Sequence, residues 1–165
     1  MSMTGNFLRV NEIELNSYLA DSSLLEKRVY NDEMEEHDPQ LLDIDKSWEG
    51  ILFLLTGQGA ENTVHPMSAL FFSGQLVDET QDIGYGPAHY LTAEQVRTLN
   101  PLIAAISTAE LGARYDADKM TELGIYPEMW RAAGMDSYLT EYFEVLQAFY
   151  AEAAKNGEAV IAFIR

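Results

Sequence analysis

The chain has 165 residues, 47% of them hydrophobic and 11% aromatic, and this composition is typical of one folded domain rather than a disordered segment. Its 27 acidic residues outnumber its 10 basic ones, and the resulting net charge of −17 repels nucleic acid and anionic membrane surfaces. The absence of cysteine excludes disulfide bonds and thiol catalysis, and it leaves His, Asp and Glu as the side-chain metal ligands.

No segment of the sequence indicates export or membrane insertion. The first ten residues, MSMTGNFLRV, lack the basic block and the apolar stretch of a secretory signal. The longest apolar run, Ile51–Leu55, is far too short to cross a bilayer. We therefore expect a cytoplasmic protein that binds neither nucleic acid nor a membrane.

The first part of the chain predicts a strand followed by two helices. Residues 6–10 (NFLRV) have the pattern of a strand. Asn11 is a typical N-cap for a helix that reaches Ala20, and Asp21 is typical of the N-cap of a second helix that reaches Val29.

An acidic run follows, in which five acids fall between Asp32 and Asp38 with no basic residue among them. Such a run predicts an exposed loop or a frayed helix end, in which the charges repel one another. The other interpretations are a docking site for a basic peptide and a weak calcium site. His37 lies within this run, where we expect it to face solvent.

Residues 42–57 (LDIDKSWEGILFLLTG) place two aspartates, a lysine and a tryptophan in front of an apolar helix. The structural interpretation is that Asp45 caps this helix, Asp43 adds a favourable charge at its start, and Trp48 is buried in the core. The functional interpretation is that the D-x-D pair binds a divalent cation. Lys46 would then contact an anion, or only form an ion pair of modest value.

The middle of the chain predicts a hairpin, a loop and a helix. Residues 67–77 (MSALFFSGQLV) have the pattern of two strands around a turn at Ser73-Gly74. Residues 83–91 predict a loop that runs into a short extended piece. A capping box at residues 92–95 (TAEQ) begins a helix that Pro101 should bend or split.

The last third predicts two short helices after Ser107 and Asp116, a helical turn at residues 128–131, a long helix from Asp136 to Lys155, and a strand at residues 159–164. One face of the long helix predicts core packing; its residues are Tyr138, Leu139, Tyr142, Phe143, Leu146, Phe149, Tyr150 and Ala153. The fold class that we predict is α+β, as a helix-rich single domain with a small mixed or antiparallel sheet of about four strands.

Residues 84–90 (GYGPAHY) form a glycine-rich segment that could hold an anion or line a small pocket. The pattern lacks the last glycine of a dinucleotide-binding motif and the lysine of a P-loop. The structural interpretation is a tight turn whose aromatic side chains cover the core. The functional interpretation is a small pocket in which Tyr85 and His89 line the wall and form hydrogen bonds to the ligand.

No complete catalytic or ligand-binding signature occurs in the sequence. A G-x-S-x-G nucleophile motif is missing, and the three histidines, His37, His65 and His89, are far apart. A zinc site would require the fold to bring them together. We therefore predict no cofactor, no metal and no catalytic residue.

Four longer motifs stand out: LDIDKSWEGILFLLTG (42–57), HPMSALFFSG (65–74), GYGPAHYLTAEQV (84–96) and GIYPEMW (124–130). Together with the MSMTGNFLRV start, they resemble the YfbM-like family of small bacterial proteins, which is grouped as a domain of unknown function. The likeness spans nearly the whole chain, and the L-D-I-D-K-x-W block is its most specific element.

The resemblance implies a single YfbM-like domain over residues 1–165, of α+β class, in a bacterial cytoplasm. Its relatives carry W-H-G-I-H-F where this chain has WEGILF at residues 48–53. Both histidines are absent here, so the resemblance assigns no histidine role at this helix. It also brings no activity with it.

The function that we favour is a non-enzymatic binding or interaction protein that neutralises a basic protein partner. The net charge of −17 and the lack of a catalytic set of residues both support it. A homodimer through an exposed edge of the helix at 136–155 is a further possibility.

The alternative is a small-molecule or enzymatic site between the helix start at 43–48 and the loop at 84–90. An aspartate would serve there as base or ligand anchor. The residues that would form this site are Asp43, Asp45, Lys46, Trp48, Tyr85 and His89.

Overall fold

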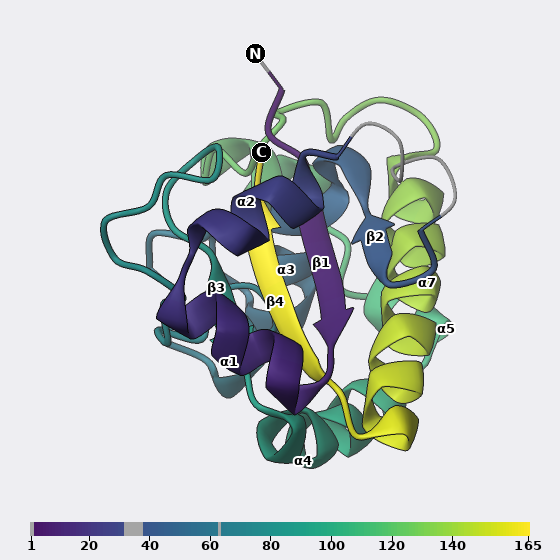
Figure 1. Cartoon of the computed structure of the whole chain (residues 1–165). Coiled ribbons are helices and arrows are strands. Elements are labelled where there is room, and N and C mark those ends of the chain that lie inside the picture. Colours follow the sequence, from purple (N-terminus) through teal and green to yellow (C-terminus); the bar gives the residue numbers. More distant parts are fainter. Residues whose placement is uncertain (1, 32–37, 63) are drawn as a thin grey trace.

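The computed structural model describes residues 2–31, 38–62 and 64–165 (Figure 1). Within these residues, four strands form an antiparallel sheet in the order β2-β1-β4-β3. They are β1 (Gly5–Val10), β2 (Leu41–Asp43), β3 (His89–Leu91) and β4 (Ala159–Ile164). The two central strands come from opposite ends of the chain and pair from Gly5 with Ile164 to Val10 with Ala159.

Seven α-helices in the described residues surround this sheet, so the predicted α+β class with a small antiparallel sheet is confirmed. They are α1 (Glu12–Ala20), α2 (Ser23–Val29), α3 (Trp48–Thr56), α4 (Ala93–Ala104), α5 (Thr108–Gly112), α6 (Ala117–Glu122) and α7 (Met135–Asn156). Two short 3-10 helices, η2 (Asp45–Ser47) and η3 (Pro66–Leu70), complete the set. No helix of the described residues is long and apolar enough to traverse a bilayer.

The sheet is the middle of three layers. Leu8 and Ile161 pack with α1 and α2 on one face, whereas Phe7 and Ala162 pack with α3, α4 and α7 on the other. Figure 1 shows α1 and α2 in front of the sheet and α3 behind it. Because both faces are covered, β4 is apolar throughout, whereas β1 keeps two polar residues, Asn6 and Arg9, among its apolar ones.

The helix signals in the sequence are largely confirmed. The side chains of Asn11, Thr92, Ser107 and Asp116 each accept the backbone N–H three residues later, and Thr92 and Gln95 form a complete capping box. The face predicted for α7 is buried or packed against the core, although Val145 on the same helix is 47% exposed. A homodimer through α7 stays a prediction.

Several expectations about local structure are wrong. Helix α2 has Ser22 rather than Asp21 at its N-cap, and no side chain caps it. Residues 67–77 contain η3 and no strand, because Met67, Leu70 and Phe71 turn into the core and the Tyr150 hydroxyl donates to the Leu70 carbonyl at 3.0 Å. The two strands predicted here are replaced in the sheet by β2, which the sequence did not reveal, and by β3, which lies in the extended piece predicted within residues 83–91.

The other two differences lie in the second half of the chain. Helix α4 continues past Pro101 to Ala104, so of the two predicted effects of Pro101, a bend or a split, the split does not occur. Residues 128–131 form no helix, because the backbone of Glu128 takes the left-handed region at φ 63°.

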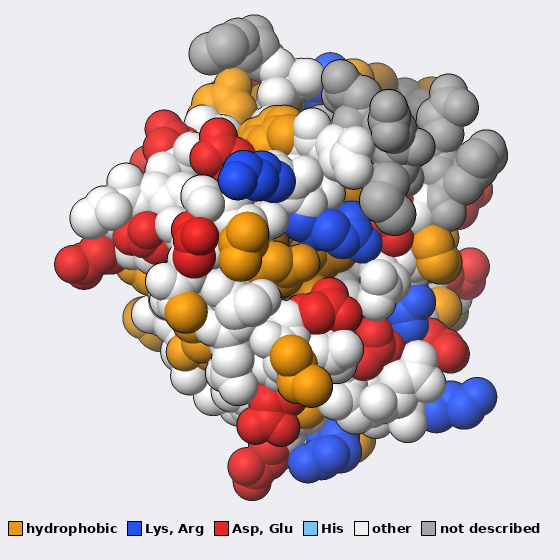
Figure 2. All heavy atoms as spheres, in the orientation of Figure 1, with side chains coloured by type: hydrophobic (Ala, Val, Ile, Leu, Met, Phe, Trp, Pro, Cys, Tyr) orange, Lys and Arg blue, Asp and Glu red, His pale blue; other side chains and the backbone are white. Residues whose placement is uncertain are grey.

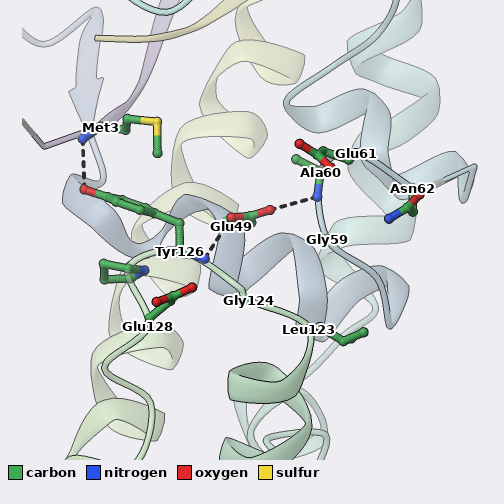
Figure 3. A pocket seen from close by; sticks show the side chains of 11 residues that line it. Met3, Glu49, Gly59, Ala60, Glu61, Asn62, Leu123, Gly124, Tyr126 and Glu128 are labelled. Atoms are coloured by element: carbon green, nitrogen blue, oxygen red, sulfur yellow. Dashed lines mark hydrogen bonds between the residues drawn. The ribbon is translucent and has the colours of Figure 1, made fainter.

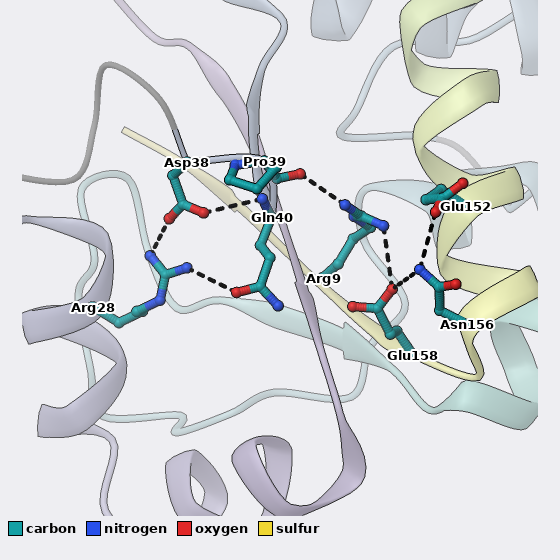
Figure 4. A network of polar contacts seen from close by, with 8 residues as sticks. All are labelled: Arg9, Arg28, Asp38, Pro39, Gln40, Glu152, Asn156 and Glu158. Carbon is teal, nitrogen blue, oxygen red and sulfur yellow. Dashed lines mark hydrogen bonds and ion pairs between the residues drawn. The ribbon is translucent and has the colours of Figure 1, made fainter.

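Two arginines hold residues 38–40 against β1 and α2 (Figure 4). Arg28 pairs with Asp38, whose side chain is only 2% exposed. Arg9 donates to the Pro39 carbonyl at 2.8 Å and pairs with Glu158 at 3.2 Å. Asp38 is therefore not in an exposed loop as predicted; the rest of the acidic run, including His37, lies outside the described residues.

Asp38 and its partners should dominate the acid sensitivity of this region. Burial raises the pKa of the Asp38 carboxyl, but the hydrogen bonds from Arg28 and the Gln40 N–H, together with the charges of Arg28 and Arg9, lower it below the ordinary 3.8. The stabilisation is thus complete above about pH 4 and is lost as the pH falls through the folded-state pKa.

We expect Asp38→Asn to lower the free energy of unfolding by about 3–5 kcal/mol at neutral pH, because it leaves a largely buried guanidinium without its partner. The matched control is Asp118→Asn, since the Arg131–Asp118 pair is exposed and should contribute about 0–1 kcal/mol. Urea unfolding measures both. Equal losses in the two variants would show that burial of the Asp38 pair has no special weight.

Gly50 marks the closest approach of α3 to its neighbours. A Cβ there would lie 2.6 Å from Cη2 of Trp130 and 2.7 Å from Cδ2 of Leu139, and both side chains are fully buried. We therefore expect Gly50→Ala to destabilise by about 1–3 kcal/mol through overpacking. Gly112→Ala in α5 is the control: its new Cβ would have a 3.5 Å contact, so stability should rise by about 0.4–1 kcal/mol. A stabilised Gly50→Ala variant would contradict this packing.

Candidate functional site

Asp43 and Asp45 of the D-I-D-K segment make other contacts than the helix cap that the sequence predicted. Asp43 is exposed at the end of β2, and its carboxylate accepts the Asp45 N–H at 2.7 Å. Asp45 lies in η2 at φ 52°, and its carboxylate accepts the Tyr138 hydroxyl at 2.8 Å. Helix α3 has no side-chain cap, so the prediction that Asp45 caps it is wrong.

Two tyrosines of α7, Tyr138 and Tyr142, lie near these aspartates and have raised pKa values. Burial raises the pKa of Tyr138, and the hydrogen bond to Asp45 and its charge raise it further. Burial and the charges of Asp45 and Asp43 likewise raise the pKa of Tyr142. The sequence placed both tyrosines on a core face; in the structure the Tyr138 hydroxyl binds the Asp45 carboxylate, and Tyr142 lies within the electrostatic reach of both aspartates.

Trp48 is buried as predicted, with 5% of its surface exposed. Its indole N–H donates to the Met3 carbonyl at 3.1 Å, and its ring stacks on Tyr126 with 6.1 Å between centroids. Lys46 takes part in none of the ion pairs among the described residues. The contacts of Trp48 with Met3 and Tyr126 hold its ring in the core, where little of it is open to a ligand.

The glycine-rich segment at 84–90 is fixed from within the chain. The Asp82 carboxylate accepts the N–H groups of Gly84 and Gly86, both at 3.0 Å, and these bonds lower the pKa of Asp82. Gly84 has φ 146°, and a Cβ there would lie 2.7 Å from the Arg165 Cα. Since a carboxylate already occupies the amides, this turn is not shaped to hold a separate anion.

Tyr85 and His89 of the same segment differ in exposure. Tyr85 is 41% exposed, and its backbone N–H donates to the Ile164 carbonyl at 3.0 Å. Nδ1 of His89 accepts the Gly74 N–H at 3.1 Å, so its proton lies on Nε2. Burial lowers the pKa of His89, which keeps the ring neutral at physiological pH.

The two predicted halves of a site meet only through an aromatic side chain. Asp43 ends β2 and His89 begins β3, and these strands are the opposite edges of the sheet. The rings of Trp48 and His89 both pack edge-on against the Phe72 ring, with 6.0 and 5.4 Å between ring centroids. The polar groups are thus not gathered around one cavity, and a binding role for them stays a prediction.

A cavity of about 450 Å³ lies elsewhere, at the end of α3 that carries Glu49 (Figure 3). It is enclosed by Met3, by the loop at 59–62 and by the turn at 123–128. Its lining includes three acids, Glu49, Glu61 and Glu128, and no basic residue. In the part of the chain that the structure describes, no cluster of three or more His, Asp or Glu is arranged to hold a metal ion.

Glu49 builds this cavity. One of its carboxylate oxygens accepts the Ala60 N–H at 2.9 Å, and the other accepts the Tyr126 N–H at 2.8 Å (Figure 3). The same side chain therefore ties two loops that are distant in sequence. A carboxylate can accept about four hydrogen bonds, so both oxygens retain capacity for a ligand.

The opposite wall of the cavity is Tyr126, which is fixed at three points. Its ring stacks on Trp48, its hydroxyl accepts the Met3 N–H at 2.9 Å, and its backbone N–H binds Glu49. Glu61 and Glu128 are exposed at the mouth. An aromatic wall combined with carboxylates suits a cationic group, which both can attract.

Sequence reasoning did not identify this cavity. Glu49, Glu61 and Glu128 are separated along the chain and share no spacing that marks a site. In the sequence, Glu49 is distinguished only by the family resemblance, which implies a histidine at its position. Glu49 is the single acid in the first turn of an otherwise apolar helix. An acid at that position ordinarily faces solvent and stabilises the helix dipole, so the sequence does not indicate that it builds a cavity.

The Tyr138 hydroxyl allows a direct test of the Asp45 contact. We expect Tyr138→Phe to lower the free energy of unfolding by about 0.5–1.5 kcal/mol, because Asp45 loses a donor and part of its surface remains open to water. Tyr142→Phe is the control, since the structure gives its hydroxyl no hydrogen bond within the described residues. If both variants lose the same amount, the Asp45 bond carries no weight of its own.

Comparison with known proteins gives a family and a fold. A family model described as "Domain of unknown function (DUF1877)" matches residues 1–163. Among solved structures, the chain resembles YfbM from Escherichia coli, described as a protein of unknown function, with 18% identity and a TM-score of 0.74. The match covers 98% of this chain and 99% of that one. No curated protein matches. The chain belongs to the DUF1877 family.

Proposed function

We propose that this chain is a non-enzymatic binding protein that captures and neutralises a basic protein partner. The observation that carries the proposal is the cavity beside Glu49, whose lining holds three acids and an aromatic ring without any basic residue. A lysine or arginine side chain of the partner would enter it. Family membership adds no activity, because the family is itself of unknown function.

The charge of the whole molecule supports the same conclusion. Four of its six arginines are paired with acids of the chain itself. The chain as a whole carries a net charge of −17, which attracts cations over distances of about 10 Å at 0.1 M salt. Figure 2 shows acidic side chains spread over the face that α1 and α2 cover, with hydrophobic and basic ones between them.

We also propose a bacterial cytoplasm as the location. The lack of cysteine fits a compartment in which disulfide bonds add no stability. A structural neighbour comes from Escherichia coli, which agrees with a bacterial source.

A short peptide rich in lysine and arginine is a suitable probe. We expect it to bind at low salt and to weaken strongly as salt approaches 1 M, where the screening length falls to about 3 Å. Replacing both Glu61 and Glu128 by Gln should weaken binding by about tenfold, because two contacts to the bound cation are lost. Isothermal titration calorimetry measures the dissociation constants.

The matched control replaces Glu141 and Glu144 of α7 by Gln, which changes the net charge by the same amount on an exposed helix face. This variant should bind almost as tightly as the wild type. If both double variants weaken equally, the binding is diffuse and the cavity has no part in it. If the peptide does not bind at low salt, the basic partner itself is excluded.

A further inference from the structure

A second cavity, of about 580 Å³, lies between α1, the start of α4 and the turn that joins α7 to β4. Figure 1 shows these three segments at the same end of the molecule. This cavity shares no residue with the acidic one beside Glu49. Its volume falls within the range of small-molecule sites, which is about 300–1,000 Å³.

Arg97 in this cavity is exceptional among the arginines. The other five each bind an acid or a backbone carbonyl of the chain; they are Arg9, Arg28, Arg114, Arg131 and Arg165. Over residues 2–31, 38–62 and 64–165, the structure gives the Arg97 guanidinium no ion pair and no hydrogen bond. In a chain with 27 acids, an arginine that is left unpaired at a cavity is available for an external carboxylate.

The rest of the lining limits which carboxylates can bind. Glu12 and Glu94 also face the cavity, so a ligand with several negative charges would be repelled there and by the net charge of −17. A ligand that carries an ammonium group beside its carboxylate meets both signs of charge. Because it is neutral overall, the field of the protein does not oppose its entry.

Apolar side chains form a further part of the wall, beside the polar Asn16 and Thr92. Leu15 and Leu19 come from α1, and Tyr90 and Ala93 come from β3 and the start of α4. Leu19 is 38% exposed, so its side chain has apolar surface left to cover. The two leucines and Ala93 suit an aliphatic side chain, whereas Asn16, Thr92 and the Tyr90 hydroxyl are the uncharged polar groups of the lining.

We propose that this cavity binds a small zwitterion of the α-amino-acid class with an aliphatic side chain, and that Arg97 contacts its carboxylate. Glu12 and Glu94 are the acids available to the ammonium group, and Leu15 with Leu19 contact the side chain. The site is independent of the proposed capture of a basic partner, and either can fail without the other.

L-Leucine is the probe, and NMR titration of the Arg97 Nε–H signal is the measurement. We expect a saturable shift with leucine. Isocaproate, which lacks the amine, and isoamylamine, which lacks the carboxylate, should each bind at least about tenfold more weakly, since each loses a charge-assisted contact. No saturation at millimolar leucine would overturn the proposal, as would isocaproate that binds as tightly as leucine.

Arg97→Gln tests the assigned contact. Arg97 is exposed on α4, so this variant should fold, and an unchanged methyl spectrum verifies that it does. We expect leucine binding, now followed through the methyl signals of Leu15 and Leu19, to weaken by about tenfold or more. Arg131→Gln, which removes an equal charge at a distant exposed pair, should leave it unchanged. Equal binding by wild type and Arg97→Gln would refute the role of Arg97.

Discussion

Glu49 imposes the constraint on which the acidic cavity depends. Helix α3 is buried on nearly every side, and Glu49 is the only charged residue in it. A carboxylate held against a core requires hydrogen-bond donors, and two backbone N–H groups from distant loops supply them. The loop at 59–62 and the turn at 123–128 are thereby brought to the same end of α3. The cavity is the space that these two loops leave open.

Most of the arginines are paired within the chain, and none lines the cavity beside Glu49. Arg9 and Arg28 serve the interior, where they fix residues 38–40 to β1 and α2. Arg114 and Arg131 pair with acids on the surface. Most of the arginines thus bind other parts of the chain, and the excess of acids over bases gives the molecule its outward negative field. Arg97 departs from this pattern, which is why its cavity suits a different ligand from the one beside Glu49.

The features that could be read from the sequence are the local ones. Helix caps at Asn11, Thr92 and Asp116 and the apolar face of α7 depend on residues within a few positions of one another, and they were predicted correctly. Strand β2 has three residues and exists only because β1 offers it an edge, so no local pattern marks it. The roles of Asp43 and Asp45 were misassigned for the same reason, since the partner of Asp45 is Tyr138 on a distant helix. Glu49 likewise acquires its role from loops that follow it by many residues.

The central claim, that a basic partner places a cationic group in the cavity beside Glu49, is tested most directly by NMR at the two amides that Glu49 accepts. On addition of a lysine- and arginine-rich peptide at low salt, we expect the N–H signals of Ala60 and Tyr126 to shift saturably and together, because a cation on the shared carboxylate weakens both bonds. Shifts confined to other acidic surfaces, with these two signals unmoved at saturation, would contradict the claim.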